Sequence, residues 1–451
     1  MSEKPTQPER VPNAPSLPAH IFNQTLGFLV FFTLLLPVIL YRTVLHISPK
    51  TRPHPSWTLR RSLAIAIGRL YLTCTTYLSL PREPGGSEWK TDDLVHRLAG
   101  KGTKVKMVRA PPVGEDWIIS IATAGSGVVQ AVDVPCFWTF VKDGKWEEGD
   151  ERAEEGEKVI MYVNGGSWVM GHPQSTMFPY EFARITRRRV LAPNHRKALT
   201  PSTAFPAQLL DLLAGYAYLL SLGFVSHNII LVGDSSGGHL QLALSRYVAE
   251  LGRVVPGLGV GMPGGLVLVS PSSDLSHPPI SQRPTDYLVP YLNRRAYPSL
   301  TRHYAPSAVR TSPYFSPAVC GSFAYLACAQ KEGRARMRQA QPHSHPQPPS
   351  QPHALSSPAA ESETNAQEAN NSDWLHSGLP IYIQYSPTEN LHPDITRLIT
   401  RMRGDGVRVR ADEVEGGVHL DAGVAWALRE RSGGGRGSWG RLVWGVGEVA
   451  A

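Results

Sequence analysis

The chain has 451 residues, with 45 lysines and arginines against 37 acidic residues and a formal net charge of +8. This length allows one large α/β domain with accessory segments, or two domains. The cations are mostly scattered, and the chain shows neither zinc-finger spacing nor a basic stripe with interleaved aromatic residues, which argues against nucleic-acid binding. The four cysteines are too few and too irregularly spaced for a disulfide framework or for paired metal ligands.

The N-terminal segment predicts a membrane anchor. Residues 1–20 are polar and rich in proline, so we expect them to be disordered. Residues 21–41 carry no charged side chain over a length that spans the hydrocarbon core of a bilayer. A helix buried in a soluble protein usually has a polar face, and the small-residue cleavage site of a signal peptide is missing after this segment. We therefore interpret 21–41 as a transmembrane signal anchor.

The expected protein crosses the membrane once, in the endoplasmic reticulum, and its orientation stays open. Two cations precede the apolar segment and five follow it, namely Lys4 and Arg10 before, and Arg42, Lys50, Arg52, Arg60 and Arg61 after. The positive-inside rule then favours a cytosolic C-terminal part. The glycosylation sequon Asn370-Asn371-Ser372 points to the opposite side.

Residues 57–80 are mostly apolar and predict a second helix. This helix contains Arg60, Arg61 and Arg69, and an arginine in the middle of a span is costly at bilayer depth. We expect an amphipathic cap helix that packs on the following domain or lies in the membrane surface.

The alternation of strand and helix patterns beyond residue 100 predicts an α/β fold. The expected strands are 105–109 and 117–122 as an opening antiparallel pair, then 136–141, 159–163, 189–192, 229–232, 265–270, 379–385 and 407–413. The expected helices are 178–187, 205–222, 240–245, 395–403 and one that begins at 424. Such alternation gives a mostly parallel central sheet with helices on both faces. We assign the domain to residues 57–430.

Two insertions and a tail interrupt or follow this pattern. Residues 276–315 are rich in proline, tyrosine and arginine and are expected to form a cap insertion. Residues 331–372 are of low complexity and are expected to be a disordered insertion, because they cannot bury enough apolar surface. Its histidines at 343, 345 and 353 fit a solvated linker better than a metal site. Residues 431–451 read as a glycine-rich tail without an identifiable role.

The sequence Gly233-Asp234-Ser235-Ser236-Gly237 has the pattern G-x-S-x-G and lies between a buried strand and a helix. In that context the pattern predicts a nucleophile elbow, a sharp turn that exposes the central serine. Glycines at 233 and 237 avoid collisions with neighbouring elements in such a turn. Ser235 is therefore the expected nucleophile.

A serine nucleophile needs a base that is oriented by an acid, and in sheet hydrolases the chain order is serine, acid, histidine. His419 follows the last predicted strand in a Gly-Gly loop and is the expected base. Glu389 follows the preceding strand and is the expected acid. Asp394 lies in the same loop and stays an alternative acid, although it also suits the start of the next helix.

An oxyanion hole requires backbone N–H donors that face the tetrahedral oxygen. Ser236 would supply one donor directly after the nucleophile. Gly165 and Gly166 follow the buried strand 159–163 and would supply the others, because a glycine backbone can approach the substrate without a Cβ in between.

Five motifs in this order resemble the hormone-sensitive lipase family of α/β-hydrolases, in particular a fungal branch of steryl acetyl hydrolases and secondary-metabolite esterases. These motifs are Asn164–Trp168, Phe205–Gln208 with Asp211, Gly233–Gly238, Ser270-Pro271, and the Glu389 loop with His419. The resemblance covers about residues 57–430. It implies hydrolysis of hydrophobic carboxylic esters by a Ser–acid–His triad under an N-terminal cap. A second resemblance, to kynurenine formamidases, rests on the Gly-Gly-Ser-Trp stretch alone.

The chain departs from the hormone-sensitive lipase pattern at three positions. Asn164 stands where that family usually has histidine, and Ser167 stands where it often has glycine. The acid loop opens with Ser386-Pro387 in place of a glycine. The first two changes leave backbone donors available, whereas the third bears on the assignment of Glu389.

We therefore expect a membrane-anchored serine esterase without a metal or organic cofactor, whose partners are a small hydrophobic ester and the membrane. The expected substrate is a short acyl ester, such as an acetate, of a sterol-like or secondary-metabolite alcohol. An amidase or acyltransferase with the same triad is one alternative. A non-catalytic binding protein on the α/β-hydrolase fold is another, although the related gibberellin receptors lack the functional histidine. The sequence leaves the oligomeric state open.

Overall fold

The computed structural model describes residues 17–76, 94–125, 127–142, 151–276, 307–340, 374–430 and 437–451. Within these residues an eight-stranded sheet has the strand order β1-β2-β4-β3-β5-β6-β7-β8. The strands are β1 (Thr103–Ala110), β2 (Val134–Val141), β3 (Val159–Val163), β4 (Val190–Pro193), β5 (Ile229–Asp234), β6 (Gly265–Val269), β7 (Ile381–Tyr385) and β8 (Arg410–Glu413). Strands β1 and β2 run antiparallel to their neighbours, and the other pairs are parallel. The predicted mostly parallel sheet is confirmed.

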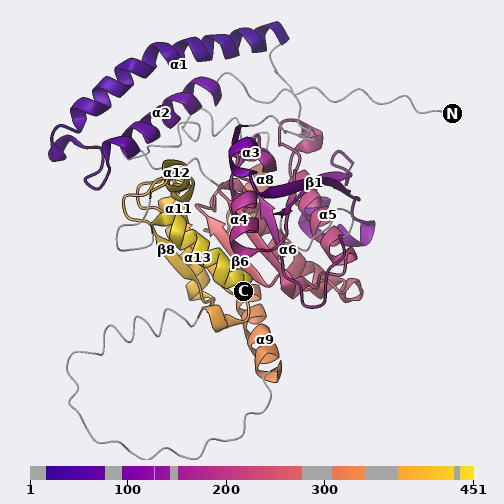
Figure 1. The fold of residues 1–451 in the computed structure, drawn as a ribbon. Helices are drawn as coiled ribbons and strands as arrows, with labels where there is room; N and C mark the ends of the chain where they lie inside the picture. Colours follow the sequence, from indigo (N-terminus) through magenta and orange to yellow (C-terminus); the bar gives the residue numbers. More distant parts are fainter. Residues whose placement is uncertain are drawn as a thin grey trace, which may run out of the picture.

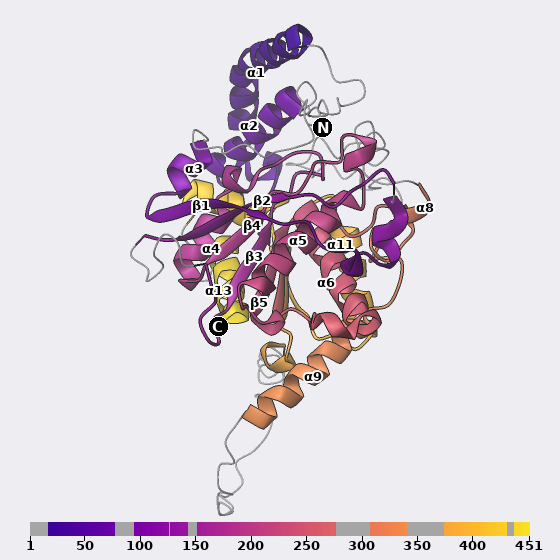
Figure 2. The same cartoon turned by 90° about the vertical axis from the view of Figure 1, so that its right-hand side faces the viewer.

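The central strands are hydrophobic throughout because helices cover both of their faces. In β3 the alternating side chains divide between two apolar clusters: Ile160 and Tyr162 lie in one, Met161 and Val163 in the other. Figure 2 shows the two helical layers on either side of the strands. One layer contains α4 (Phe178–Thr186), α12 (Asp421–Leu428) and α13 (Ser438–Ala450). The other contains α5 (Ala207–Ser221), α6 (Ser236–Val254), α9 (Ala324–Ala340) and α11 (His392–Gly404). Two shorter helices are α3 (Leu94–Ala99) and α8 (Ser307–Arg310).

The expected strand at 117–122 is wrong. This segment forms 3-10 turns at Glu115–Trp117 and Ser120–Gly125, and β1 pairs with β2 instead. The hydroxyl of Tyr247 accepts the Ile119 N–H at 2.8 Å and donates to the Trp117 carbonyl at 2.8 Å. The Tyr247 side chain of α6 thus binds the backbone groups of Trp117 and Ile119. In a strand these groups would pair with a neighbouring strand.

Two expected segment boundaries also change. Residues 438–450 are no tail: α13 packs against the sheet, and Leu442 and Val446 are fully buried. Residues 331–340 are not part of a disordered insertion, because α9 continues to Ala340. The expectations for 1–16, 77–80, 277–306 and 341–372, including the sequon and the three histidines, lie outside the described residues.

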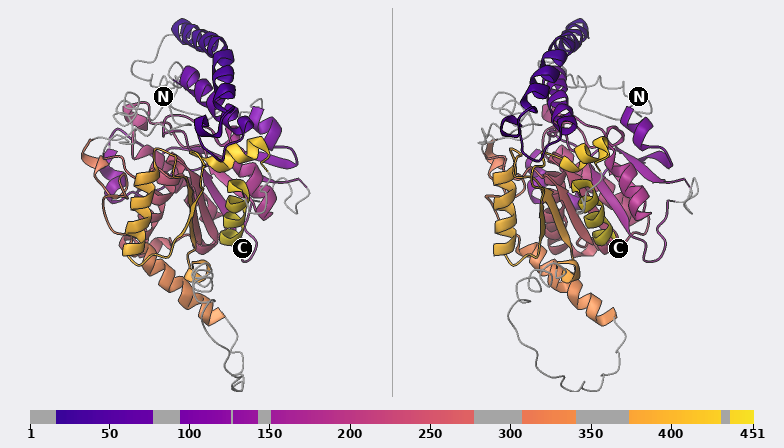
Figure 3. Two further views of the ribbon diagram at one scale, coloured as in Figure 1. Left: turned by 90° about the vertical axis from the view of Figure 1, so that its left-hand side faces the viewer. Right: turned by 60° about the vertical axis from the view of Figure 1, so that its left-hand side comes forward.

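Two N-terminal helices, α1 (Leu17–Leu45) and α2 (Leu59–Thr76), pack together and project from the domain beside α12 (Figures 1 and 3). Among the described residues, Ile21–Leu45 is the one helix long and apolar enough to cross a membrane. Only 6% of the most apolar stretch of this helix is buried inside the structure. Its large exposed side chains include Phe22, Leu29, Phe32, Leu36 and Leu40. In this structure the segment is therefore not buried in the core of the domain.

Candidate active site

Ser235 occupies the turn between β5 and α6. Its backbone angles, φ 51° and ψ −120°, belong to neither helix nor strand. The Ser235 N–H donates to the Val269 carbonyl at 2.8 Å, and the Ser235 carbonyl accepts the Ser272 N–H at 3.1 Å. The end of β6 therefore holds the serine in a conformation that an isolated chain would avoid.

The two glycines of the motif are required by contacts. A Cβ at Gly237 would lie 2.1 Å from the Val163 carbonyl oxygen, and one at Gly233 would lie 2.5 Å from the Gly237 carbonyl oxygen. These are backbone neighbours that cannot move aside. The elbow packs the start of α6 against both β3 and β5. Only glycine therefore fits at 233 and at 237.

The structure brings the three predicted side chains together. His419 Nε2 lies 3.0 Å from Ser235 Oγ, and His419 Nδ1 lies 2.6 Å from Glu389 Oε2. The serine follows β5, the glutamate follows β7 and the histidine follows β8, so all three lie at the carboxyl edge of the sheet. A carboxylate only accepts hydrogen bonds, which assigns the proton to Nδ1 and leaves Nε2 to accept the serine proton.

The Glu389 carboxylate is completely buried and has several donors. Its Oε1 accepts the Ser386 N–H at 2.9 Å and the Ser270 hydroxyl at 3.1 Å. The Ser270 oxygen in turn accepts the N–H of Leu420 at 3.2 Å. Ser270 thus ties the acid to the residue that follows the histidine. The sequence contained Ser270 within a family motif, but nothing local indicated this bridging role.

Asp394, the alternative acid, lies in the first turn of α11 and does not contact His419. Its nearest cation is Arg397, at 3.9 Å. Burial raises the pKa of Asp394 to about 6, with a further rise from Asp274 and a partial offset by Arg397. The geometry therefore favours Glu389 as the acid.

Glu389→Gln and Asp394→Asn separate the two assignments. We expect the first change to lower kcat by roughly 10³–10⁴-fold, because an amide no longer stabilises the imidazolium. The second should leave kcat within a few-fold of the unchanged protein. Steady-state hydrolysis of an activated ester measures both, and a severe loss in Asp394→Asn alone would reverse the assignment.

The loop after β3 lies directly against the elbow. A Cβ at Gly165 would lie 3.0 Å from the Ser235 Cβ, and the Trp168 N–H donates to Ser236 Oγ at 3.3 Å. A Cβ at Gly165 would also lie 2.5 Å from Oδ2 of the buried Asp234 carboxylate, which accepts a hydrogen bond from the Tyr162 hydroxyl. Burial nevertheless raises the pKa of Asp234 to about 6.

The predicted oxyanion donors lie in this loop and at the start of α6. The absence of a side chain at Gly165 allows the loop to approach Ser235 closely. Gly166 has a positive φ of 132°, and a Cβ there would lie 2.2 Å from the Met170 carbonyl oxygen. The N–H groups of Gly165, Gly166 and Ser236 stay the predicted donors.

The loop that carries His419 is held by α2 and the turn before it. Trp57 Nε1 donates to the Gly416 carbonyl at 2.6 Å. Arg61 is 8% exposed and pairs with Asp421, whose Oδ1 also accepts the Val418 N–H at 2.9 Å. Sequence analysis interpreted Arg61 only as a charge that disfavours a membrane span, because its acidic partners Asp421 and Glu430 lie some 360 residues away.

Arg61→Met is expected to lower both stability and kcat, since it leaves the Asp421 carboxylate buried without its cation. Removing one member of a buried pair costs on the order of 3 kcal/mol. Arg60→Met is the matched control, because Arg60 is exposed on the same helix. Thermal unfolding and esterase kinetics below the midpoint test this. Identical behaviour of the two variants would contradict a bracing role for Arg61.

No group of three or more His, Cys, Asp or Glu side chains that could hold a metal ion occurs in the described part of the chain.

Residues 160–331 match a family model described as the alpha/beta hydrolase fold. An acetyl-hydrolase from Streptomyces hygroscopicus is 30% identical over 125 residues, which cover 28% of this chain and 39% of that protein. The esterase LipU from Mycobacterium tuberculosis is 30% identical over 165 residues, which cover 35% of this chain and 50% of LipU. The chain thus spans half or less of the length of these two relatives.

Among solved structures, carboxyl esterase 2 from the fungus Tuber melanosporum superposes with a TM-score of 0.50 at 17% identity, covering 77% of this chain and 87% of that one. This likeness shows the fold. Together with the family match over residues 160–331, it shows that the chain has the α/β-hydrolase fold.

Proposed function

We propose that the protein is a serine-dependent carboxylic ester hydrolase, held at a membrane by α1, that removes a short acyl group such as acetyl from a lipophilic alcohol. The observation that carries this proposal is the contact series Ser235–His419–Glu389, with distances of 3.0 and 2.6 Å. The names of the two relatives, an acetyl-hydrolase and an esterase, support an ester substrate and a short acyl group.

In the proposed reaction Ser235 Oγ attacks the ester carbonyl carbon while His419 Nε2 takes its proton. Glu389 stabilises the imidazolium that forms. The negative oxygen of the tetrahedral intermediate accepts hydrogen bonds from N–H groups of Gly165, Gly166 and Ser236. A single such donor contributes roughly 10²–10³-fold to kcat.

Collapse of the intermediate breaks the bond to the alcohol, and His419 returns the proton to the leaving alkoxide. An acyl group then remains on Ser235. Water attacks this acyl-enzyme with the same histidine as base, which releases the carboxylic acid and restores the serine.

The position of the N-terminal helices supports a lipophilic substrate. Exposed apolar side chains cover α1, and the neighbouring α2 contacts the loop that carries His419. An ester dissolved in the membrane would therefore reach the site close to the histidine. A sterol-like or secondary-metabolite alcohol fits this arrangement and the family resemblance, and we include it in the proposal.

The test is a substrate comparison with the full chain in neutral detergent. We expect acetate and butyrate esters of a sterol to be cleaved faster than palmitate esters, and faster than the matching acetamides. Acyl transfer to an added alcohol should stay below hydrolysis. Faster cleavage of the amide would favour an amidase, and dominant transfer would favour an acyltransferase; either outcome would overturn the proposal.

A further inference from the structure

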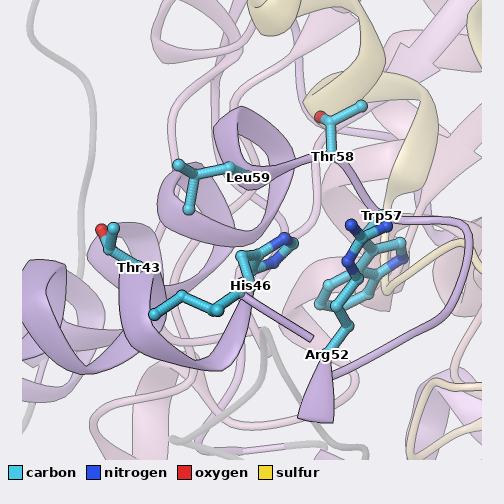
Figure 4. Close-up of a pocket in the computed structure, with 7 residues that line it drawn as sticks. Thr43, His46, Arg52, Trp57, Thr58 and Leu59 are labelled. Carbon is cyan, nitrogen blue, oxygen red and sulfur yellow. The ribbon is translucent and has the colours of Figure 1, made fainter. Parts of the chain in front are cut away.

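A pocket lies where the chain turns from α1 into α2, away from the Ser235 site. Its volume is about 280 Å³. It is lined by Thr43, His46, Ile47, Arg52, Trp57, Thr58 and Leu59, and Figure 4 shows these side chains around it. Trp57 also supports the His419 loop, and the other lining residues have no role in the proposed ester hydrolysis.

The charge around the pocket is of one sign. Residues 17–76 contain six lysines and arginines and no aspartate or glutamate. Arg61 is neutralised by Asp421 and Glu430, but Arg52 has no acidic partner among the described residues. An anion that enters the pocket therefore meets an uncompensated positive potential.

Two polar nitrogen atoms of lining residues are buried without a hydrogen-bond partner in the described structure, namely His46 Nε2 and Arg52 Nε. Buried donors are normally satisfied, and the two side chains that carry these atoms line the pocket. Burial, followed by Arg52 and Arg42, lowers the pKa of His46. The neutral imidazole still donates one N–H.

The position of the pocket indicates that its occupant also has an apolar part. The apolar helix ends at Leu45, so the pocket lies at the level where a membrane-spanning segment leaves the hydrocarbon core. Ile47 is 80% exposed at its rim, and Val44 is 60% exposed on the last turn of α1. An occupant with an anionic head and apolar chains satisfies both sets of side chains.

We propose that this pocket binds the phosphate group of an anionic glycerophospholipid, with the guanidinium of Arg52 and the imidazole of His46 as donors. The acyl chains lie along the exposed apolar face of α1. The inference rests on the membrane attachment in the proposed function but not on ester hydrolysis, so it is tested by binding alone.

The experiment uses the delipidated full chain in neutral detergent and native mass spectrometry to measure bound lipid. Short-chain phosphatidic acid, the matching phosphatidylcholine and inorganic phosphate are the three probes. We expect phosphatidic acid to bind most tightly, because its phosphomonoester carries more negative charge than the phosphodiester of phosphatidylcholine, whose choline cation also adds a like charge near Arg52. Equal binding of the two lipids would overturn the proposal. Full competition by millimolar inorganic phosphate would show a free-anion site and would overturn the lipid assignment.

Arg52→Gln should weaken binding of phosphatidic acid by about tenfold or more. Arg52→Lys should restore part of it, because the charge returns without the planar donors. Lys50→Gln is the matched control, an exposed cation two residues away that does not line the pocket. Thermal unfolding without lipid verifies that the variants fold. If Arg52→Gln binds like the unchanged chain, or if Lys50→Gln loses binding equally, the pocket is not the site.

Discussion

Ser235→Ala is expected to abolish ester hydrolysis, with a fall in kcat of roughly 10⁴–10⁶-fold. The reason is that Ser235 Oγ is the one hydroxyl that lies 3.0 Å from His419 Nε2 in the described structure. The same change should remove covalent labelling by a fluorophosphonate, which reacts with activated serines. Labelling and turnover are measured on the same purified preparation.

Ser273→Ala is the control for this experiment. Ser273 is buried beside Ser272, whose N–H donates to the Ser235 carbonyl, and its own hydroxyl has no hydrogen-bond partner among the described residues. We expect this variant to keep both labelling and turnover. Persistent labelling of Ser235→Ala would show that another residue is the nucleophile.

His419→Ala is expected to lower kcat by a similar factor, because both proton transfers depend on its imidazole. KM should change much less, since the imidazole contributes little to binding the rest of the ester. Thermal unfolding should remain cooperative, because the cavity lies at the edge of the sheet and the brace from Trp57 and Arg61 to the loop is unchanged. Stopped assays over long incubation times measure such low rates.

His392→Gln serves as the comparison for His419→Ala. His392 begins α11 and contacts Glu413 at 3.5 Å, so it shares the region but not the contact with Ser235. We expect near-normal turnover. If His419→Ala retained more than a few per cent of the activity, the proposed base would be wrong.

The sequence predicted the turn at Ser235, because neighbouring residues alone determine its backbone. The elbow at Ser235 is set by one strand, two glycines and one helix, all within a short stretch, and the sequence shows each of them. In sheet hydrolases the acid and the histidine follow the serine along the chain. The search for these two residues could therefore be limited to the ends of the strands after β5. Distinguishing Glu389 from Asp394 required the structure, because both belong to one loop. The contact with His419 and the hydrogen bonds from Ser386 and Ser270 are made by Glu389.

The missed elements depend on contacts between distant residues. Helix α13 contains three glycines, which lower its intrinsic helix propensity. Gly445 lies against the ring of Tyr382, where a Cβ would come within 2.7 Å, so packing on β7 rather than propensity determines this helix. The segment 117–122 is an almost continuous apolar run, which is typical of a buried strand, but its backbone groups at Trp117 and Ile119 bind the hydroxyl of Tyr247 instead.

The brace between α2 and the His419 loop has a consequence for making a soluble fragment. Deleting residues 1–76 to avoid detergent would also delete Trp57 and Arg61. The Gly416 carbonyl and the Asp421 carboxylate would lose their donors, and the apolar Val418 would lose its contact with Trp57. A truncated enzyme that begins near Pro53 should keep these supports while shedding the apolar span, so the membrane segment and the catalytic unit can be separated only upstream of Trp57.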